Sequence, residues 1–473
     1  MSEATRRGQV FRYESYAISP EAGLLSCHYS VDGRQFEERF TLSPVGRWGS
    51  PLVPAAARLV FLLAGVSYYK TAAPPVIDLG DTALTDRERD FLRQFYLQGL
   101  GEFAYRNDLD LSDLRIDGFK RAPAADGLSG ATGERGSAAR EAGRAERAPV
   151  SGGPGGRPPG QARPLIPFGG GIDSIVTVEK IRVLAPDSAL FVVSKPGARF
   201  DAIEKPAAVT GLPVIRAGRE IDPQLLRSAE LGFLNGHVPV TGIISAVAVL
   251  AAVLDGRDAV VMSNEWSASV PTLEHDGKPV NHQWSKGADF EGALRKILGD
   301  AALPDYFSGL RDRTELWVGD EFAKLERYHR AFRSCNRAFH IDPARRLDHW
   351  CGECDKCCFI DLILAPFMSA GALRDVFDVV PEPLSRPDLG EKFRTLLGSG
   401  TKPFECVGEV NECRAAVVLA ARRPDRADCT LLQELAGEVT GRPDAPTDPE
   451  IAAMQRPVGS NFIPAAYSFE ASA

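Results

Sequence analysis

The sequence lacks the features of a membrane, secreted or nucleic-acid-coating protein. Its longest uncharged apolar run, residues 241–254, is shorter than the ~20 residues that cross a bilayer, and residues 1–13 contain no apolar core of a secretory signal. The net charge of −8 leaves no basic excess for a nucleic acid. The 9 cysteines are odd in number, and several of them crowd into residues 351–358 instead of forming a spread disulfide framework. We therefore expect a cytoplasmic protein with no membrane or nucleic-acid partner.

Apolar and aromatic residues are also nearly absent from one internal segment, residues 121–163. It contains one leucine, one valine and no aromatic residue, so it cannot bury enough apolar surface to offset the entropy of ordering. We expect a disordered linker or insertion there. It would separate an N-terminal region, residues 1–120, from the remainder of a chain whose 473 residues are enough for two or three domains.

The N-terminal region combines strand and helix patterns and is expected to be α+β. Two segments before residue 43 alternate apolar and polar side chains, and the second contains Asp32-Gly33, a favoured two-residue hairpin turn. A helix is predicted over residues 55–63. Another is predicted to begin at Thr85, which forms a capping box with Glu88.

Beyond the linker, short apolar runs alternate with helical patterns. Strands are predicted at 165–168, 189–194, 212–217 and 258–263, and helices at 173–184, 200–209 and 241–255. This alternation is typical of a doubly wound α/β fold, in which helices cover both faces of a parallel sheet. We therefore predict a nucleotide-binding domain over 164–288, a helical C-terminal region with the cysteine cluster over 289–447, and a tail over 448–473.

The first of these strands runs into three consecutive glycines, in the stretch PLIPFGGGIDS. Gly169, Gly170 and Gly171 would turn the chain from strand to helix and present backbone N–H groups to an anion at a helix N-terminus. Ser174 could donate to a phosphate oxygen, and Asp173 could hold a cation or cap the helix. Neither GxxxxGK[ST] nor GxGxxG is present. The stretch predicts a polyphosphate site, the alternative being a tight turn that binds no ligand.

The same stretch resembles the PP-loop, SGGxDS, of ATP pyrophosphatases, with Gly169 in place of the family's first serine. The resemblance implies a PP-loop fold that binds ATP and Mg²⁺, adenylates an oxygen of a second substrate and releases pyrophosphate. It also implies that Ser194, at the end of the second strand, lies beside the adenine, with Lys195 near a phosphate. The missing serine leaves open a nucleotide-binding regulatory protein without catalysis.

Cysteine is concentrated in the stretch CGECDKCC. Cys351, Cys354 and Cys357 have the spacing CxxCxxC, and Cys335 precedes them by a short segment. Four thiolates can hold one Zn²⁺ in a closed tetrahedral site, which is structural rather than catalytic. Three nearby residues could replace Cys335 as the fourth ligand: His340, His349 and Cys358. The alternative without a metal is a set of reduced cysteines at a helix cap.

Several longer motifs resemble the MurL type of UDP-N-acetylmuramoyl-L-alanyl-L-glutamate epimerase. In chain order they are LLAGVSYYKTAAPPVIDLG, GEFAYRNDL, NGHVPVTGIIS, SNEWSAS, VNHQWSKG, HWCGECDKC and KPFECVGEV. The resemblance spans nearly the whole chain except the linker. It implies ATP- and Mg²⁺-dependent inversion of the terminal L-Glu of UDP-N-acetylmuramoyl (UDP-MurNAc)-L-Ala-L-Glu through an acyl adenylate, with AMP and pyrophosphate as products. It also implies a link to a ligase that adds L-Glu to UDP-MurNAc-L-Ala in peptidoglycan precursor synthesis.

Polar residues within these motifs are the candidate catalytic residues. Glu265, just past the end of a predicted strand where open α/β sheets bind ligands, ranks with His282 and Lys286, and none of the three is assigned as the base. Further candidates are His237, Cys406, Tyr69 and Lys70. Two other functions stay open: a 7-cyano-7-deazaguanine synthase, a PP-loop enzyme with a similar cysteine layout, and a peptide epimerase of secondary metabolism.

Deleting residues 126–160 should leave solubility, thermal stability and catalytic turnover nearly unchanged, because the segment has too few apolar residues to contribute to a core. Thermal unfolding and a turnover assay on the shortened and full-length chains test this. A large loss of soluble, active protein would show that the segment packs or binds.

Overall fold

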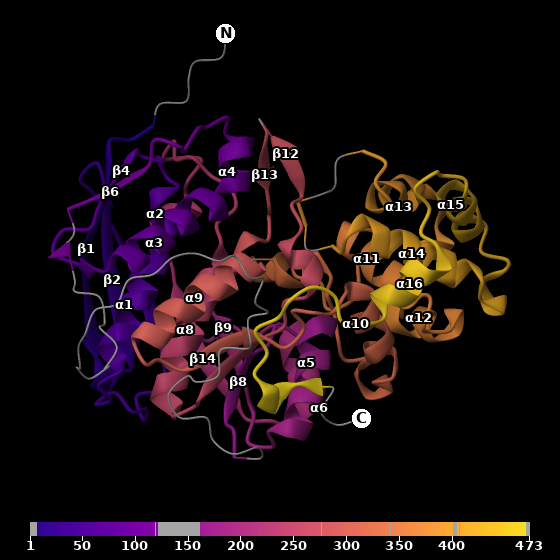
Figure 1. The fold of residues 1–473 in the computed structure, drawn as a ribbon, viewed down its shortest axis with the longest axis horizontal. Coiled ribbons are helices and arrows are strands. Elements are labelled where there is room, and N and C mark those ends of the chain that lie inside the picture. Colours follow the sequence, from indigo (N-terminus) through magenta and orange to yellow (C-terminus); the bar gives the residue numbers. More distant parts are fainter. Residues whose placement is uncertain are drawn as a thin grey trace, which may run out of the picture.

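The computed structural model describes residues 7–118, 120–121, 161–275, 277–340, 342–400, 404–405 and 407–469. Residues 122–160 of the predicted linker and the candidate Cys406 lie outside the described residues. The described part is an α/β structure built around one large sheet (Figure 1).

The sheet has ten strands in the order β14-β11-β8-β9-β10-β3-β2-β1-β4-β6. Their bounds are β1 (Val10–Ser19), β2 (Leu24–Val31), β3 (Arg34–Thr41), β4 (Val76–Asp78), β6 (Arg115–Asp117), β8 (Pro164–Pro167), β9 (Ala189–Ser194), β10 (Val214–Glu220), β11 (Ala259–Met262) and β14 (Asp305–Ser308). From β14 to β10 every neighbouring pair is parallel, whereas β10 pairs antiparallel with β3. Two short ladders lie outside the sheet: β5 (Ala83–Leu84) with β7 (Lys120–Arg121), and β12 (Leu273–His275) with β13 (Lys278–Val280).

Successive side chains of the parallel strands enter two different cores. In β9, Phe191 belongs to one core and Leu190 to the other. In β11, Val260 and Val261 are divided in the same way. A strand whose residues are buried on both faces is continuously apolar, which is the pattern that predicted a parallel sheet covered on both sides.

Helices supply the other half of each core. Their bounds are α1 (Val53–Ala64), α2 (Val66–Tyr69), α3 (Asp86–Gly99), α4 (Gly101–Arg106), α5 (Ile172–Leu184), α6 (Asp201–Thr210), α7 (Pro223–Leu226), α8 (Val240–Asp255), α9 (Ala288–Asp300), α10 (Glu315–Ala323), α11 (Asp355–Leu364), α12 (Ala370–Phe377), α13 (Gly390–Leu396), α14 (Val410–Ala421), α15 (Thr430–Thr440) and α16 (Asp448–Met454). Helices α1, α3, α8 and α9 share one core, and α5, α6, α10 and α11 share the other. Helices α11 to α16 gather at one end of the molecule (Figure 1). Within the described ranges, no helix has both the length and the apolar character needed to cross a membrane.

Two features of the N-terminal part, a hairpin and the start of a helix, match the sequence pattern. Strands β2 and β3 form the predicted hairpin, and its turn residues Asp32 and Gly33 have positive φ angles of 49° and 84°, as a two-residue hairpin turn requires. At the start of α3, the capping box of Thr85 and Glu88 is present. Local sequence therefore fixes these two features.

Three strands of the sheet were not predicted: β4 and β6 in the N-terminal region, and β14. β14 lies in the segment after residue 289, which the sequence pattern presents as mostly helical, yet it pairs with β11 along its whole length. Its four residues, DYFS, are too few and too mixed in polarity to show a strand pattern, although Tyr306, Phe307 and Ser308 are buried. Sheet pairing, which the local pattern does not report, decides its conformation.

A buried ion pair lies where β10 meets β3. Nε of Arg219 donates to Oε1 of Glu38 at 2.5 Å, and Nη2 donates to Oγ of Ser67 at 3.1 Å. The Glu38 side chain is fully buried. Burial raises the pKa of Glu38, and the charge of Arg219 opposes that rise.

Arg219→Met should lower the free energy of unfolding by about 3–5 kcal/mol, because it leaves the Glu38 carboxylate buried without its partner. The matched control is Arg87→Met, which removes a pair between Arg87 and Asp300 whose side chains are 53% and 44% exposed; it should cost less than about 1 kcal/mol. Denaturant unfolding of both variants measures the difference. Equal costs would contradict a structural role for the β10–β3 pair.

Candidate active site

The five parallel strands lie in the order β10-β9-β8-β11-β14, so chain order reverses between β8 and β11. In open α/β sheets, ligands bind at the carboxyl ends of the strands at such a switch point. The three glycines follow β8 at this position, and Glu265 follows β11. Ser308, the last residue of β14, accepts a hydrogen bond from the backbone N–H of Asn264 at 2.7 Å. The glycine turn and Glu265 therefore reach the same edge.

The turn after β8 requires glycine at its centre. Gly170 has a φ of +78°, and a Cβ there would lie 2.2 Å from the carbonyl oxygen of Ala202. At Gly169 a Cβ would meet no described atom within 4 Å, so the serine of the SGGxDS pattern would also fit. Gly171 is the N-cap of α5 and provides no side-chain cap, and Ser174 Oγ donates to the Gly171 carbonyl at 2.9 Å. The turn thus presents backbone N–H groups at the N-terminus of a helix, an arrangement that binds phosphate groups.

Three carboxylates meet at the switch point: Asp173 of α5, Glu265 after β11 and Glu315 at the start of α10. One oxygen from each lies within 4.8 Å of the others. Glu265 and Glu315 are buried. Carboxylate oxygens are the ligands that Mg²⁺ prefers, so this group can hold a divalent cation.

Electrostatics favour a cation at this carboxylate cluster. Burial raises the pKa of Glu315 well above its ordinary value, and the charges of Asp173 and Glu265 raise it further. Oε2 of Glu315 is buried and, among the described residues, has no hydrogen-bond partner. Behind it, Glu412 of α14 accepts a hydrogen bond from the backbone N–H of Leu316 at 3.0 Å, and burial raises its pKa to about 8. A bound cation would relieve the repulsion among these acids.

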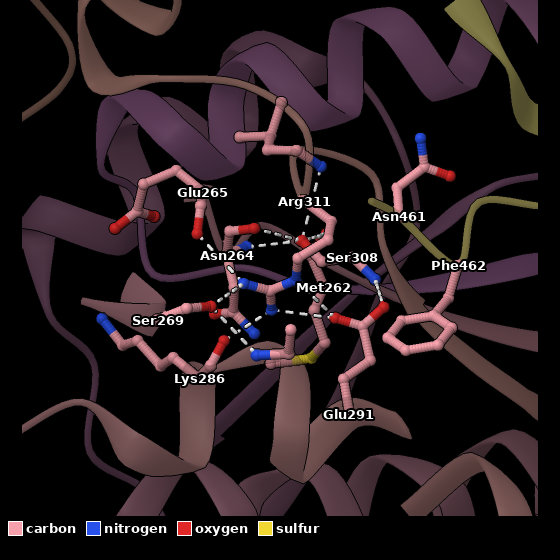
Figure 2. Close-up of polar contacts among 12 residues, drawn as sticks. Met262, Asn264, Glu265, Ser269, Lys286, Glu291, Ser308, Arg311, Asn461 and Phe462 are labelled. Atoms are coloured by element: carbon pink, nitrogen blue, oxygen red, sulfur yellow. Dashed lines mark hydrogen bonds and ion pairs between the residues drawn. The ribbon is translucent and has the colours of Figure 1, made fainter. Parts of the chain in front are cut away.

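Arg311 fixes the loops beside the carboxylate cluster (Figure 2). Its buried guanidinium pairs with Glu291 of α9 at 2.8 Å. Nη1 donates to the carbonyl of Glu265 at 3.1 Å, and Nη2 donates to the carbonyl of Lys286 at 2.5 Å. Figure 2 shows the side chains of Glu265 and Lys286 extending to the same side of Arg311, whereas Glu291 approaches from the other side. Arg311 therefore joins the segment after β11 to the segment that contains Lys286.

A second polar cluster brings the N-terminal region against the residues after β13. Oε2 of Glu102, in α4, forms a hydrogen bond with Nδ1 of His282 and lies 3.9 Å from Nδ1 of His237. The centroids of the two imidazole rings are 4.3 Å apart. Burial, and then the proximity of His282, lowers the pKa of His237 to about 4, and Lys286 and Lys70 also lower it. His237 is therefore neutral at pH 7.

Two residues of the C-terminal region, Phe404 and Gly408, lie beside the two clusters. The ring of Phe404 lies 6.2 Å from the ring of His282, and the guanidinium of Arg106 lies 4.8 Å from the Phe404 centroid. Four residues later, a Cβ on Gly408 would lie 3.3 Å from Cγ of Glu315. The C-terminal region thus contributes a neighbour to each of the two clusters.

The predicted cysteines come together at the start of α11. Sγ atoms of Cys335, Cys351, Cys354 and Cys357 lie within 4.8 Å of one another, and Cys357 Sγ is 3.7 Å from that of Cys351 and 3.4 Å from that of Cys354. Tetrahedral zinc with Zn–S bonds of ~2.3 Å places sulfurs about 3.8 Å apart. Hydrogen bonds from the other thiols, Cys335 first, lower the pKa of Cys351. Within the described residues, this cluster leaves out the alternative ligands His340, His349 and Cys358.

The structure separates the predicted site residues into groups. Asp173 and Glu265 lie in the carboxylate cluster, and His282 lies in the histidine cluster with Lys286 nearby. At the end of β9, Oγ of Ser194 donates to the carbonyl of Ala198 at 3.2 Å.

The two N-terminal candidates have different positions. Nζ of Lys70 donates to Oδ1 of Asn235 at 2.9 Å and so lies close to His237. Tyr69 instead packs in the N-terminal core, with its ring centroid 4.9 Å from that of Tyr96. Only Lys70 of these two approaches a polar cluster.

Two site residues were missed by sequence reasoning. Glu315 follows the helix cap Thr314 and has the pattern of an ordinary acid in a first helical turn. Glu102 lies in the motif GEFAYRNDL, where its acidic side chain beside apolar neighbours was the available signal.

Comparisons with known proteins extend over nearly the whole chain. Residues 2–309 match the family described as MurL N-terminal domain, and residues 331–449 match MurL C-terminal domain. The chain is 37% identical to the UDP-N-acetyl-alpha-D-muramoyl-L-alanyl-L-glutamate epimerase of Salinispora tropica, over 99% of this chain and 96% of the relative. Proteins of the same name from Xanthomonas oryzae pv. oryzae and Micromonospora sp. are each 35% identical, over 97% and 93% of this chain and 95% and 92% of their own length. No solved structure matches the chain.

Cys354→Ser should lower the zinc content of the purified protein and reduce its thermal stability, because metal-binding energy at such a site is partly folding energy. The matched control is Cys358→Ala, four residues further along and outside the cluster, which should retain the metal. Elemental analysis and thermal unfolding measure both effects. Metal-free wild-type protein that tolerates Cys354→Ser would show that these are ordinary buried cysteines.

Proposed function

The chain belongs to the MurL family, and we propose that it is a cytoplasmic epimerase that converts the terminal L-Glu of UDP-MurNAc-L-Ala-L-Glu to D-Glu. ATP and Mg²⁺ drive the reaction through an acyl adenylate, with release of AMP and pyrophosphate. The observation that carries this proposal is the carboxylate cluster beside a glycine turn at the switch point of the sheet. The substrate would come from a ligase that adds L-Glu to UDP-MurNAc-L-Ala in peptidoglycan precursor synthesis.

The chemistry explains why an epimerase needs a nucleotide site. A free carboxylate resists loss of the neighbouring α-proton, because the carbanion would form beside a negative charge. Attack of the carboxylate oxygen on the α-phosphorus of ATP releases pyrophosphate and removes that charge. The α-proton can then leave, a proton can return to the opposite face, and water can cleave the acyl–phosphate bond to give the D-residue and AMP.

The residues at the switch point fit the first step. The backbone of Gly169, Gly170 and Gly171 and the hydroxyl of Ser174 would hold phosphate oxygens at the N-terminus of α5. Asp173, Glu265 and Glu315 would hold Mg²⁺, whose charge offsets that of the phosphates. The position of Glu265 within this set favours metal binding over proton abstraction. Ser194 ends the adjacent strand, where the adenine would lie.

The second step falls to the other predicted residues, His282 and Lys286. Both belong to the segment that Arg311 ties to the carboxylate cluster. A side chain within hydrogen-bond reach of the reacting proton is the first requirement of a general base, and the tie through Arg311 supports these two residues as candidates for that role.

The strand order and glycine turn support a PP-loop fold for this domain. The four cysteines support a structural Zn²⁺, because a closed four-sulfur site leaves no coordination position for a substrate. The match to named epimerases over 93% or more of the chain favours this function over a 7-cyano-7-deazaguanine synthase.

Incubation with ATP, Mg²⁺ and UDP-MurNAc-L-Ala-L-Glu should give AMP, pyrophosphate and, on chiral analysis of the hydrolysed product, D-Glu. Asp173→Ala and Glu315→Gln should each abolish AMP formation, since each removes a cation ligand. Asp320→Asn is the matched control: Asp320 lies on the same helix as Glu315 but pairs with Lys324 at 3.0 Å, and this variant should stay active. Wild-type AMP release in the first two variants would contradict the assignment. ATP consumption only with 7-carboxy-7-deazaguanine and ammonia would identify the synthase instead.

A further inference from the structure

The N-terminal region supplies one buried acid to the histidine cluster. Glu102 is 5% exposed. Its Oε1 accepts a hydrogen bond from Nε of Arg106 at 2.6 Å, and its Oε2 bonds Nδ1 of His282. Burial alone would raise the pKa of Glu102, but the hydrogen bond and charge of His282 lower it overall. The carboxylate is therefore ionised and held by a partner on each oxygen.

The charges around Glu102 argue against a metal ion in this cluster. Arg106, His237 and His282 lie around Glu102, and the charges of Lys286 and Lys70 act on His237. A divalent cation would meet repulsion from three positive charges and attraction from one carboxylate. The same surroundings stabilise a negative charge that develops on a bound substrate.

We propose that Glu102 and His282 form a carboxylate–imidazole dyad that removes the glutamyl α-proton, so that the N-terminal region supplies part of the proton-transfer machinery. This inference rests on the proposed function. Glu102 is the positioning residue: with Nδ1 of His282 donating to the carboxylate, the ring accepts a proton at Nε2, and the carboxylate stabilises the imidazolium that forms.

The proton balance of the step requires a second group. The α C–H bond breaks, an N–H bond forms at Nε2 of His282, and the electron pair moves into the carbonyl of the activated carboxyl group. His237 cannot supply the opposite face, because a centroid separation of 4.3 Å leaves no room for a substrate carbon between its ring and that of His282. The ammonium of Lys286 returns a proton to the other face, and both groups then regain their starting states by exchange with solvent.

Two connections couple this dyad to the nucleotide site. Arg311 holds the carbonyl of Glu265 and the carbonyl of Lys286 with the two nitrogens of one guanidinium. Phe404 lies beside His282, and Gly408, four positions later in the chain, lies beside Glu315. The proposal requires a carboxylate activated at the cation site to present its α-carbon to the dyad, and these connections would hold the two sites in a fixed relation.

The test separates the two half-reactions in the full-length enzyme with ATP, Mg²⁺ and UDP-MurNAc-L-Ala-L-Glu in D₂O. Wild type should release pyrophosphate and place solvent deuterium at the glutamate α-carbon. Glu102→Gln should keep pyrophosphate release and lose deuterium incorporation by about 10²–10⁴-fold, the usual contribution of a general base. His282→Asn should show the same split. Glu102→Asp should recover part of the exchange, because it restores the charge.

The pH dependence of deuterium exchange distinguishes a catalytic role of Glu102 from a structural one, because a purely structural role would leave it unchanged. In Glu102→Gln the acidic limb of the profile should shift to lower pH, because an imidazolium without a neighbouring carboxylate loses its proton more readily. The matched control is His28→Gln: His28 lies on β2 between the buried Cys27 and Tyr29 and faces away from the core. This control should keep the wild-type profile.

The outcomes are distinct. Equal loss of pyrophosphate release and exchange, or wild-type exchange, in Glu102→Gln would overturn the dyad. A second equivalent of metal in wild type that this variant loses would replace the dyad with a metal site. Failure of the wild type to form AMP would overturn the proposed function. The wild-type assay alone gives this result, so it is distinguishable from failure of the dyad.

Discussion

The candidate site depends on one buried ion pair, Arg311 with Glu291. Both side chains are 1% exposed, and either charge left alone there would destabilise the fold by several kcal/mol. The pair is stable because its hydrogen-bonding groups have partners. Glu291 also accepts a hydrogen bond from the backbone N–H of Ser308 at 2.9 Å, and the guanidinium donates to the carbonyls of Glu265 and Lys286. Loops that would otherwise be free to move relative to the sheet are therefore positioned by one side chain.

The continuous sheet imposes the second constraint. Because β10 pairs with β3, the N-terminal strands extend the parallel sheet, and α1 packs against α8 in a shared core. The segment just before α8 carries His237, and α4 carries Glu102. Nδ1 of His237 and Oε2 of Glu102 are thereby held 3.9 Å apart, which a flexibly tethered N-terminal domain would not achieve.

Sequence reasoning succeeds where the cause is local. The strand at 189–194 coincides with β9, the glycine turn lies at a strand–helix junction, and the cysteine spacing predicts a cluster because few other arrangements suit four neighbouring thiols. Sequence reasoning fails where contacts between segments distant in the chain determine the conformation or position of a residue. Glu315 looks like any acid in a first helical turn until β8, β11 and α10 bring it to Asp173. The predicted nucleotide-binding domain likewise ends before β14, whose strand character comes from β11.

The C-terminal stretch returns from the helical end of the molecule to lie beside α5 (Figure 1). The ring of Tyr467 is 5.1 Å from that of Phe307, Asn461 donates to Oδ2 of Asp312 at 2.6 Å, and Oγ1 of Thr314 donates to the carbonyl of Met454 at 2.7 Å. Two of these contacts hold Asp312 and Thr314, which precede Glu315 in the chain. A carboxylate of the cluster is therefore braced by residues 140 or more positions further along the chain. A substitution in that C-terminal stretch could loosen Glu315 without touching any member of the cluster.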